Sequence, residues 1–342
     1  MTAPIVSHRS AAFLEVYGRI ATGLQEVFRT GRDVPFATGS ATLVMEMAVG
    51  STVRRDVLNL VCGAFSERWH AISRSLGKRA DRLDVPWGRA VDPDLVRRAL
   101  RRKRYDAVTV VHNETSTGVI NPLADIARAV REESDALVLV DAVSSLAGAP
   151  VETDGWGLDV VLTGSQKALA APPGLVPFAA SGRAERRAAG VEDRGYYTDL
   201  LRYLRRHRKD GTITTPAIPV AWALERQLAR IAGEGLEARW RRHRELRDRV
   251  AGWLDGGGGA RGVTFAVDDP AFRSPTVSCL RPPPGVEAPA LVARLADKGF
   301  TVAGGYGAWK ADTFRIGHMG EVRSEDLDEL LAALDETLDD GV

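Results

Sequence analysis

The chain has 342 residues and a formal net charge of +1, with 44% apolar and 27% charged residues. This length permits more than one domain, and the balanced charge gives no overall attraction to nucleic acid or to an acidic membrane. Cys62 and Cys279 lie far apart without metal-ligand spacing. We therefore expect no disulfide framework, no metal site and a reducing cytoplasm. No apolar run approaches the roughly 20 residues that span a bilayer, and residues 1–10 lack a secretory-signal pattern.

Short apolar runs alternate with amphipathic stretches between residues 34 and 181. The runs are almost continuously apolar, which is typical of strands buried on both faces of a parallel sheet. The pattern therefore predicts an α/β fold with a mostly parallel central sheet between layers of helices. The expected strands are 34–38, 57–61, 107–111, 137–141, 160–163 and 175–180, and the expected helices are 43–50, 66–77, 93–103 and 123–133.

The second half of the chain has a different pattern. Residues 221–254 form one long helical stretch, which Gly233 and Gly235 are expected to interrupt, and the four glycines 256–259 predict a flexible turn. Shorter apolar runs and helical segments follow up to residue 338. We predict a large domain, 1–220, and a smaller C-terminal α+β domain, 221–342, joined by the long helical stretch.

Polar clusters follow several of the predicted strands. Residues 38–46 read TGSATLVME, a loop of small residues that opens a helix, and a helix start suits a phosphate group. Residues 112–118 read HNETSTG, and two single charges, Asp141 and Lys167, come after later strands. An ordinary N-cap and an ordinary turn also explain the first two clusters. A carboxylate at a buried strand end is costly without a partner, so we expect a cation near Asp141.

Asp141 and Lys167 are 26 positions apart, separated by one crossover. A lysine and an aspartate around a phosphate-binding helix start fit pyridoxal phosphate. The lysine would form a Schiff base with its aldehyde, and the aspartate would pair with its ring nitrogen. A plain Asp141–Lys167 salt bridge without a cofactor explains the same residues, and spacing alone leaves both interpretations open.

Six segments carry a family resemblance in a fixed order. They are TGSATLVME, HNETSTGV, VDAVSSLAG, GSQKALAAPPG, TPAIPV and GGYG…FRIGHMG. Together they resemble the class V aminotransferases, most closely the alanine–glyoxylate and serine–glyoxylate (serine–pyruvate) group, from about His8 to the end of the chain. The resemblance implies the pyridoxal-phosphate-dependent transferase fold of type I and a homodimer with shared active sites.

The resemblance also implies roles for residues around the cofactor ring. Lys167 would form the Schiff base and carry the proton between the substrate and the cofactor, and Asp141 would hold the ring nitrogen. Thr115 would hydrogen-bond near the ring hydroxyl. Phe65 would stack on the ring, with a buried core phenylalanine as the alternative.

Further roles concern the cofactor phosphate and the substrate. Ser40, Ala41 and Thr42 would bind the phosphate through the helix start, with Gln166 beside them. Thr215 would reach the phosphate of the neighbouring subunit. Arg315 would bind the substrate carboxylate with two parallel hydrogen bonds, although a surface arginine on a strand is an alternative.

The chain departs from the family pattern at several points. Ala41 stands where relatives usually have glycine. Thr212 stands where they often have tyrosine, which predicts the loss of one phosphate contact. The chain also begins where relatives have already formed an N-terminal arm. We expect His318 to be hydrogen-bonded in the core. Cys279 lies in a predicted strand, whereas a desulfurase needs its cysteine on a mobile loop. The tyrosines 196, 197 and 203 are expected at the dimer interface.

The resemblance leads us to expect an aminotransferase that moves an amino group from an alanine- or serine-like donor to a 2-oxo acid such as glyoxylate or pyruvate. Two alternatives stay open. One is another pyridoxal-phosphate enzyme on the same scaffold, an aminophosphonate transaminase or a lyase. The other is a non-catalytic protein that binds the cofactor. Neither a nucleic-acid nor a membrane partner is expected.

Overall fold

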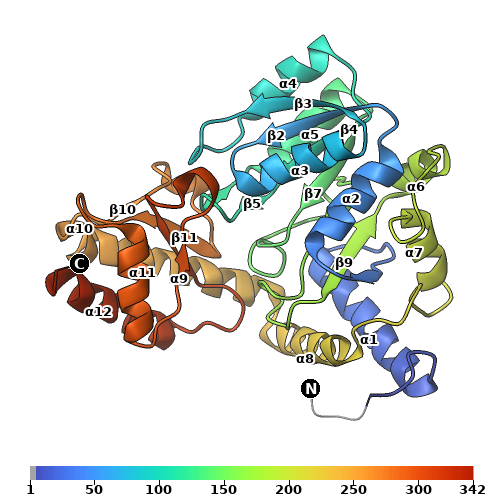
Figure 1. Cartoon of the computed structure of the whole chain (residues 1–342). Helices are drawn as coiled ribbons and strands as arrows, with labels where there is room; N and C mark the ends of the chain where they lie inside the picture. The colour runs from blue at the N-terminus through green and yellow to red at the C-terminus, as the bar shows by residue number, and fades with distance from the viewer. Residues whose placement is uncertain (1–4, 342) are drawn as a thin grey trace.

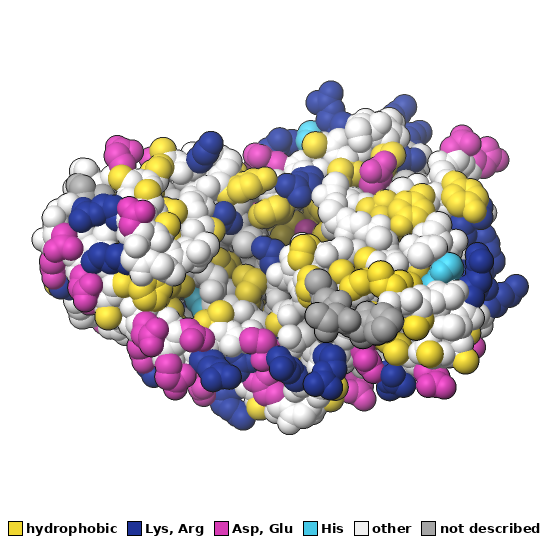
Figure 2. Space-filling model, turned by 60° about the horizontal axis from the view of Figure 1, so that its bottom comes forward, with side chains coloured by type: hydrophobic (Ala, Val, Ile, Leu, Met, Phe, Trp, Pro, Cys, Tyr) yellow, Lys and Arg dark blue, Asp and Glu magenta, His cyan; other side chains and the backbone are white. Residues whose placement is uncertain are grey.

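The computed structural model describes residues 5–341 of the chain, so residues 1–4 of the N-terminal segment discussed above lie outside it. The described residues form a seven-stranded and a four-stranded sheet, each with its own helices (Figure 1). Figure 2 shows the surface hollowed between these two parts, with basic side chains at the edge of the hollow. No helix in the described part is both long and apolar enough to cross a membrane.

The seven-stranded sheet has the order β1-β9-β8-β7-β4-β2-β3. Its strands from β8 to β3 run parallel, while β9 is antiparallel to both of its neighbours. The predicted mostly parallel sheet is therefore confirmed. The strands are β1 Phe36–Thr38, β2 Asp56–Val61, β3 Arg79–Asp84, β4 Ala107–Val111, β7 Leu137–Asp141, β8 Val160–Leu162 and β9 Leu175–Ala180.

Helices cover both faces of this sheet. Alternate strand residues point to opposite faces, so Val138 and Val140 pack into one core and Leu137 and Leu139 into the other. The first core is closed by α1, α4, α5 and α8, and the second by α2, α3, α6 and α7. These helices are α1 Ala11–Phe28, α2 Ala41–Thr52, α3 Ala64–Ser75, α4 Pro93–Arg102, α5 Leu123–Glu133, α6 Gly182–Ala189, α7 Leu200–His207 and α8 Ile218–Glu234.

Two elements were not predicted from the sequence. Strand β3, with the sequence RADRLD, lies at the sheet edge and is largely exposed, so it carries no apolar run. A small hairpin, β5 Asn113–Glu114 and β6 Val119–Ile120, bends the HNETSTG segment back on itself. The hairpin places the polar residues of that segment beyond the end of β4.

The long helical stretch is divided at one glycine. Gly235 has φ 82°, a left-handed conformation that ends α8 and begins α9, Leu236–Asp255. Gly233 stays inside α8. The flexible turn expected at residues 256–259 is wrong, because Gly257–Ala260 form a short helical turn, α10, between α9 and the second sheet.

The four-stranded sheet is antiparallel and has the order β10-β11-β13-β12. Leu280, Phe314 and Ile316 from its strands pack with apolar residues of α9, α11 and α12 in a third core. The remaining elements are β10 Thr264–Phe265, β11 Val277–Arg281, β12 Ala303–Gly304, β13 Phe314–Gly317, α11 Ala288–Asp297, α12 Ser324–Asp339 and the 3₁₀ turns η1 Pro270–Phe272 and η2 Gly307–Trp309.

Candidate active site

A cavity of about 240 Å³ lies where β4 and β7 end. In a parallel sheet covered by helices, ligands bind at this edge because the strand ends and the starts of the following helices meet there. Eight of the ten residues proposed from the sequence line it; Thr215 and Arg315 are the exceptions. The lining residues are Ser40, Ala41, Thr42, Met45, Phe65, Arg68, Val111, Asn113, Thr115, Asp141, Val143, Ser144, Gln166 and Lys167.

Asp141 is the last residue of β7 and is only 5% exposed. Its Oδ1 accepts a hydrogen bond of 2.8 Å from the Val143 backbone N–H. Burial raises the pKa of this carboxyl to about 7, although the Val143 N–H and the nearby charges of Arg68 and Lys167 lower it. The cations near it are Arg68 and Lys167, but neither forms an ion pair with it within the described residues, so the alternative of a plain Asp141–Lys167 salt bridge is wrong.

Lys167 lies half-buried in the loop between β8 and β9. Burial and the neighbouring Arg315 charge lower the pKa of its amine, while Asp141 raises it. The loop itself is well fixed. Ser165 Oγ donates to Pro172 O at 2.6 Å, Ala170 N–H donates to Lys167 O at 2.8 Å, and the Arg239 guanidinium donates to Ala168 O at 2.8 Å. A fixed backbone therefore carries an amine that has no hydrogen-bond partner among the described side chains.

The start of α2 forms another wall of the cavity. Ser40 is the N-cap residue, yet its side chain makes no capping hydrogen bond. The backbone N–H groups of Ala41 and Thr42 also donate to no described residue. Gln166 from the lysine loop lines the same cavity. Free N–H groups at the start of a 12-residue helix form a site for an anion.

Phe65 and Thr115 lie on the side of the cavity formed by α3 and the β5–β6 hairpin. Thr115 Oγ1 and Ser144 Oγ are hydrogen-bonded at 2.6 Å. Asn113 Oδ1 is buried and has no hydrogen-bond partner. A buried acceptor without a partner is costly, so it indicates a place where a ligand or water supplies the missing donor.

Glu114 fixes the start of α3 next to this wall. Its carboxylate accepts hydrogen bonds from the backbone N–H groups of Phe65 at 3.2 Å and Ser66 at 2.9 Å, and from Ser116 Oγ at 2.6 Å. The fully buried carboxylate thus caps a helix that begins 50 residues earlier in the chain. This contact orients the Phe65 backbone, and no local sequence signal predicts it.

Arg315 approaches the cavity from β13. Its Nη1 donates to the carbonyl oxygen of Thr115 at 3.1 Å, and Thr115 lines the cavity. Its Nε donates to Gly304 O at 3.0 Å. Burial lowers the pKa of Arg315, and no carboxylate among the described residues forms an ion pair with it. The guanidinium is therefore oriented by two carbonyl groups and keeps its remaining N–H groups for a ligand.

Several other predictions concern residues outside the cavity. Thr215 is exposed and lies in the segment before α8, so its role stays a prediction. His318 is fully buried and pairs with Ser278 Oγ at 3.0 Å, which confirms the core histidine. Cys279 is buried in β11, as expected. The interface prediction is wrong for Tyr203, which is buried within this chain against Phe178.

Arg68 and Tyr306 were missed from the sequence. Arg68 lines the cavity, and its Nη1 donates to Thr42 Oγ1 at 3.4 Å. Its Nη2 donates to the Tyr306 hydroxyl at 3.3 Å. Tyr306 also stacks on Phe65, with ring centroids 5.4 Å apart. The contacts of Tyr306 join segments about 240 residues apart. Tyr306 stands in the GGYG part of a segment that carries the family resemblance, but no role was predicted for it.

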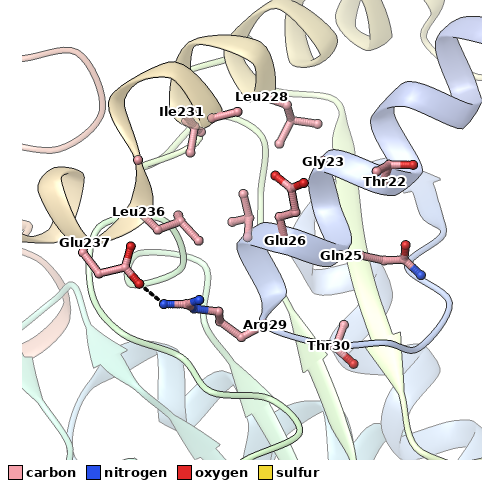
Figure 3. Close-up of a pocket in the computed structure, with 13 residues that line it drawn as sticks. Thr22, Gly23, Gln25, Glu26, Arg29, Thr30, Leu228, Ile231, Leu236 and Glu237 are labelled. Atoms are coloured by element: carbon pink, nitrogen blue, oxygen red, sulfur yellow. Dashed lines mark hydrogen bonds and ion pairs between the residues drawn. The ribbon is translucent and has the colours of Figure 1, made fainter.

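A larger groove of about 520 Å³ lies elsewhere, between the end of α1 and the α8–α9 junction (Figure 3). Apolar side chains such as Leu228 and Ile231 form one wall, and an ion pair between Arg29 and Glu237 crosses its edge. The groove shares no lining residue with the cavity around Lys167. It has no nucleophile and no unpaired buried acid, so the smaller cavity is the candidate active site.

Comparisons with known proteins agree with this assignment. The model of the family Aminotransferase class-V matches residues 36–316. An uncharacterized aminotransferase of Methanocaldococcus jannaschii is 38% identical over 94% of this chain and 83% of its own length. The serine–glyoxylate aminotransferase of Methylorubrum extorquens is 30% identical over 98% and 86%. The crystal structure of an alanine–glyoxylate aminotransferase from Nostoc sp. superposes with a TM-score of 0.90 at 31% identity, covering 98% of this chain and 90% of that one. The chain belongs to the class V aminotransferases, pyridoxal-phosphate-dependent enzymes of fold type I.

Proposed function

We propose that this aminotransferase transfers the amino group of a small donor such as alanine or serine to a 2-oxo acid such as glyoxylate or pyruvate. The main observation behind the proposal is that Lys167 and Asp141, which form no ion pair within residues 5–341, line one cavity beside a free helix start. The relatives named above for serine, alanine and glyoxylate support this choice of substrates.

The residues of the cavity fit pyridoxal phosphate. The free N–H groups of Ala41 and Thr42, with Ser40 and Gln166 beside them, would hold the phosphate. Asp141 would pair with the ring nitrogen, which supplies the cation that its buried carboxylate lacks. Further residues that suit the ring are Phe65, by stacking on its face, and Thr115, near its hydroxyl group.

When bound, the cofactor supplies an electron sink that makes the substrate Cα proton removable. Lys167 would hold the cofactor through Nζ, and as a free amine in the presence of substrate it would move the proton between the reacting carbons. Because burial and the Arg315 charge lower the pKa of its amine, a larger fraction of Lys167 is unprotonated and able to accept that proton. Asp141 stabilises the protonated form of the ring nitrogen and so keeps the sink effective.

Arg315 would bind the substrate carboxylate. Two carbonyl groups already orient its guanidinium, which therefore loses little further freedom when it forms two parallel hydrogen bonds. This contact retains the carboxylate and argues against decarboxylation. It would put the substrate between β13 and the cavity wall, because Arg315 already bonds to Thr115 O, which belongs to that wall.

We also propose a homodimer in which Thr215 completes the phosphate site of the partner subunit, and a cofactor-binding domain, 1–220, followed by a smaller domain, 221–342. The exposure of Thr215 and the two separate sheets support these proposals. Two free, buried cysteines suit the reducing cytoplasm as the compartment. Light scattering of the purified protein tests the dimer, and cofactor titration of Thr215→Ala tests its contact.

One observation favours a second candidate, an aminophosphonate transaminase. A phosphonate calls for an additional basic group at the cavity, and Arg68 supplies one. Its guanidinium, however, already contacts Thr42 and the ring of Phe65. Alanine or serine therefore remains the proposed donor.

The test is to add single amino acids to the cofactor-loaded enzyme and to follow the visible absorbance of the cofactor. We expect alanine or serine to remove the visible band and to form pyridoxamine phosphate and the matching 2-oxo acid. A response to 2-aminoethylphosphonate alone would establish the second candidate. Release of ammonia would indicate a lyase, and no change with any amino acid would indicate a non-catalytic binding protein.

A further inference from the structure

Tyr306 links the four-stranded sheet to the wall of the active-site cavity. Its ring stacks on Phe65 with centroids 5.4 Å apart and planes 18° apart. Its hydroxyl accepts a hydrogen bond of 3.3 Å from Arg68 Nη2. Phe65 and Arg68 both line the cavity, while Tyr306 itself is 39% exposed. The ring therefore lies at the mouth of the cavity rather than in its interior.

The same turn that carries Tyr306 also holds Arg315. Arg315 Nε donates to the carbonyl oxygen of Gly304 at 3.0 Å, two residues before Tyr306. Arg315 Cζ lies 5.7 Å from the centre of the tyrosine ring. The guanidinium and the ring thus form one unit. A substrate whose carboxylate binds Arg315 has its Cα substituents next to the tyrosine ring.

This turn has little room to move. A Cβ atom at Gly305 would clash with the carbonyl oxygen of Trp309, and one at Gly307 would lie 2.7 Å from the Trp87 ring. Gly307 also has φ 56°, which favours glycine. The backbone on both sides of Tyr306 therefore has little room to move, and the contacts of the ring with Phe65 and Arg68 fix its orientation.

We propose that Tyr306 is a specificity-determining residue that restricts the substrate side chain to about the size of those of alanine and serine. The inference rests on the proposed function, because it takes the substrate carboxylate to lie on Arg315. The ring, held between Phe65 and the guanidinium, occupies the space that a branched or aromatic substrate side chain would need. Tyr306→Ala removes this wall and opens the cavity toward the solvent.

The experiment compares alanine with leucine as donors for the wild type, Tyr306→Ala, Tyr306→Phe and Tyr306→Leu. We expect Tyr306→Ala to lower the alanine-to-leucine ratio of kcat/KM at least tenfold, since a few methylene groups in an apolar subsite are worth about 10–200-fold. Tyr306→Phe keeps the ring and should retain the wild-type ratio. Lys310→Ala, an exposed change in the same loop, is the control.

A binding measurement gives a readout that needs no turnover. Calorimetry compares the dissociation constants of pyruvate and 4-methyl-2-oxopentanoate for the enzyme in its pyridoxal form. These two 2-oxo acids bind this form without transfer of an amino group. We expect Tyr306→Ala to shift this ratio in the same direction, and Tyr306→Leu serves if Tyr306→Ala does not fold. Ratios within twofold of the wild type, or equal changes in Tyr306→Phe and Tyr306→Ala, overturn the inference. A wild type that converts no amino acid refutes the proposed function instead, and the binding ratios still test the role of the ring.

Discussion

The cavity around Lys167 differs from the junction where Arg239 of α9 meets the lysine loop and the turn after β13. Buried charges lack ion-pair partners in the cavity, whereas they are paired at the junction. In the cavity, Asp141 accepts one backbone hydrogen bond and pairs with no described cation. At the junction, Arg239 of α9 is fully buried and donates to Glu234, Ala168 O, Gly320 O and Glu321. Only its Nε lacks a partner. A buried charge is costly unless it is paired, so a group left unpaired marks the place where a ligand completes the structure.

The hydrogen bonds of the junction also hold part of the active-site loop in place. His243 Nδ1 donates to Arg239 O at 2.8 Å, so its Nε2 is free of a proton and accepts from Gly320 N–H at 3.1 Å. Burial lowers the pKa of His243 to about 4, which keeps the ring neutral beside the guanidinium. Arg239 thereby fixes Ala168, the residue after Lys167, to the turn that follows the Arg315 strand.

The largest effect is expected for Lys167→Ala. The change removes both the attachment of the cofactor and the group that moves the proton, and general acid–base catalysis alone is worth about 10²–10⁴-fold. We expect turnover with alanine to fall by about 10⁴-fold or more. Single-turnover absorbance measurements check this, with Lys310→Ala as the control. A residual rate within tenfold of the wild type would show that another group carries the proton.

At the junction, the comparison predicts that replacing Arg239 lowers the free energy of unfolding and does not affect catalysis alone. Arg239→Met leaves Ala168 O and the Glu321 carboxylate without their donor, while Arg242 still donates to Glu234 and to Gly320 O. We therefore expect a loss of about 2–4 kcal/mol in the free energy of unfolding. Arg241→Met, an exposed change on the same helix, should cost less than about 0.5 kcal/mol. Denaturant titration of both variants checks this, and equal losses would contradict the structural role of Arg239.

Much of this arrangement could be predicted from the sequence. The apolar runs predicted six strands of the central sheet, and the polar residues that follow them indicated Asp141, Lys167 and the start of α2 as parts of a site. Strand β3 was missed because it is a charged edge strand. Arg68 and Tyr306 were missed because their contacts depend on the packing of the two sheets. The cation expected near Asp141 is found only in part, because the charges of Arg68 and Lys167 act on this carboxyl but neither forms an ion pair with it among the described residues. The rule that a buried charge is paired within the chain fails at a site built for a ligand.

A smaller effect is expected for Arg315→Lys, which keeps the charge. Lysine has no planar fork, so it cannot reproduce the bonds of Arg315 to Gly304 O and Thr115 O together with a two-point contact to a carboxylate. We expect kcat/KM for alanine to fall about 10²-fold, mainly through KM. Steady-state kinetics checks this. A lysine variant with an unchanged KM would place the substrate carboxylate elsewhere.

The smallest expected effect concerns pH and follows from the unpaired carboxylate itself. The pKa of Asp141 in the folded, cofactor-free protein is raised to about 7, mainly by burial, so its contribution to stability declines as pH rises from about 4 to 7. Asp141→Asn does not titrate, so its stability relative to the wild type should increase over that range and then level off. A shift of about three units in the pKa corresponds to at most about 4 kcal/mol, and water entering the cavity reduces this, so we expect a difference of about 1–2 kcal/mol.

The buried histidines 112, 243 and 318 have lowered pKa values, so they destabilise both proteins toward acid, and their contributions cancel in the difference. Denaturant titrations of the cofactor-free proteins at pH 5 and pH 8 measure the effect. Loading the cofactor should abolish or reverse the advantage of Asp141→Asn, because the ring nitrogen then supplies the partner that distinguishes this cavity from the junction.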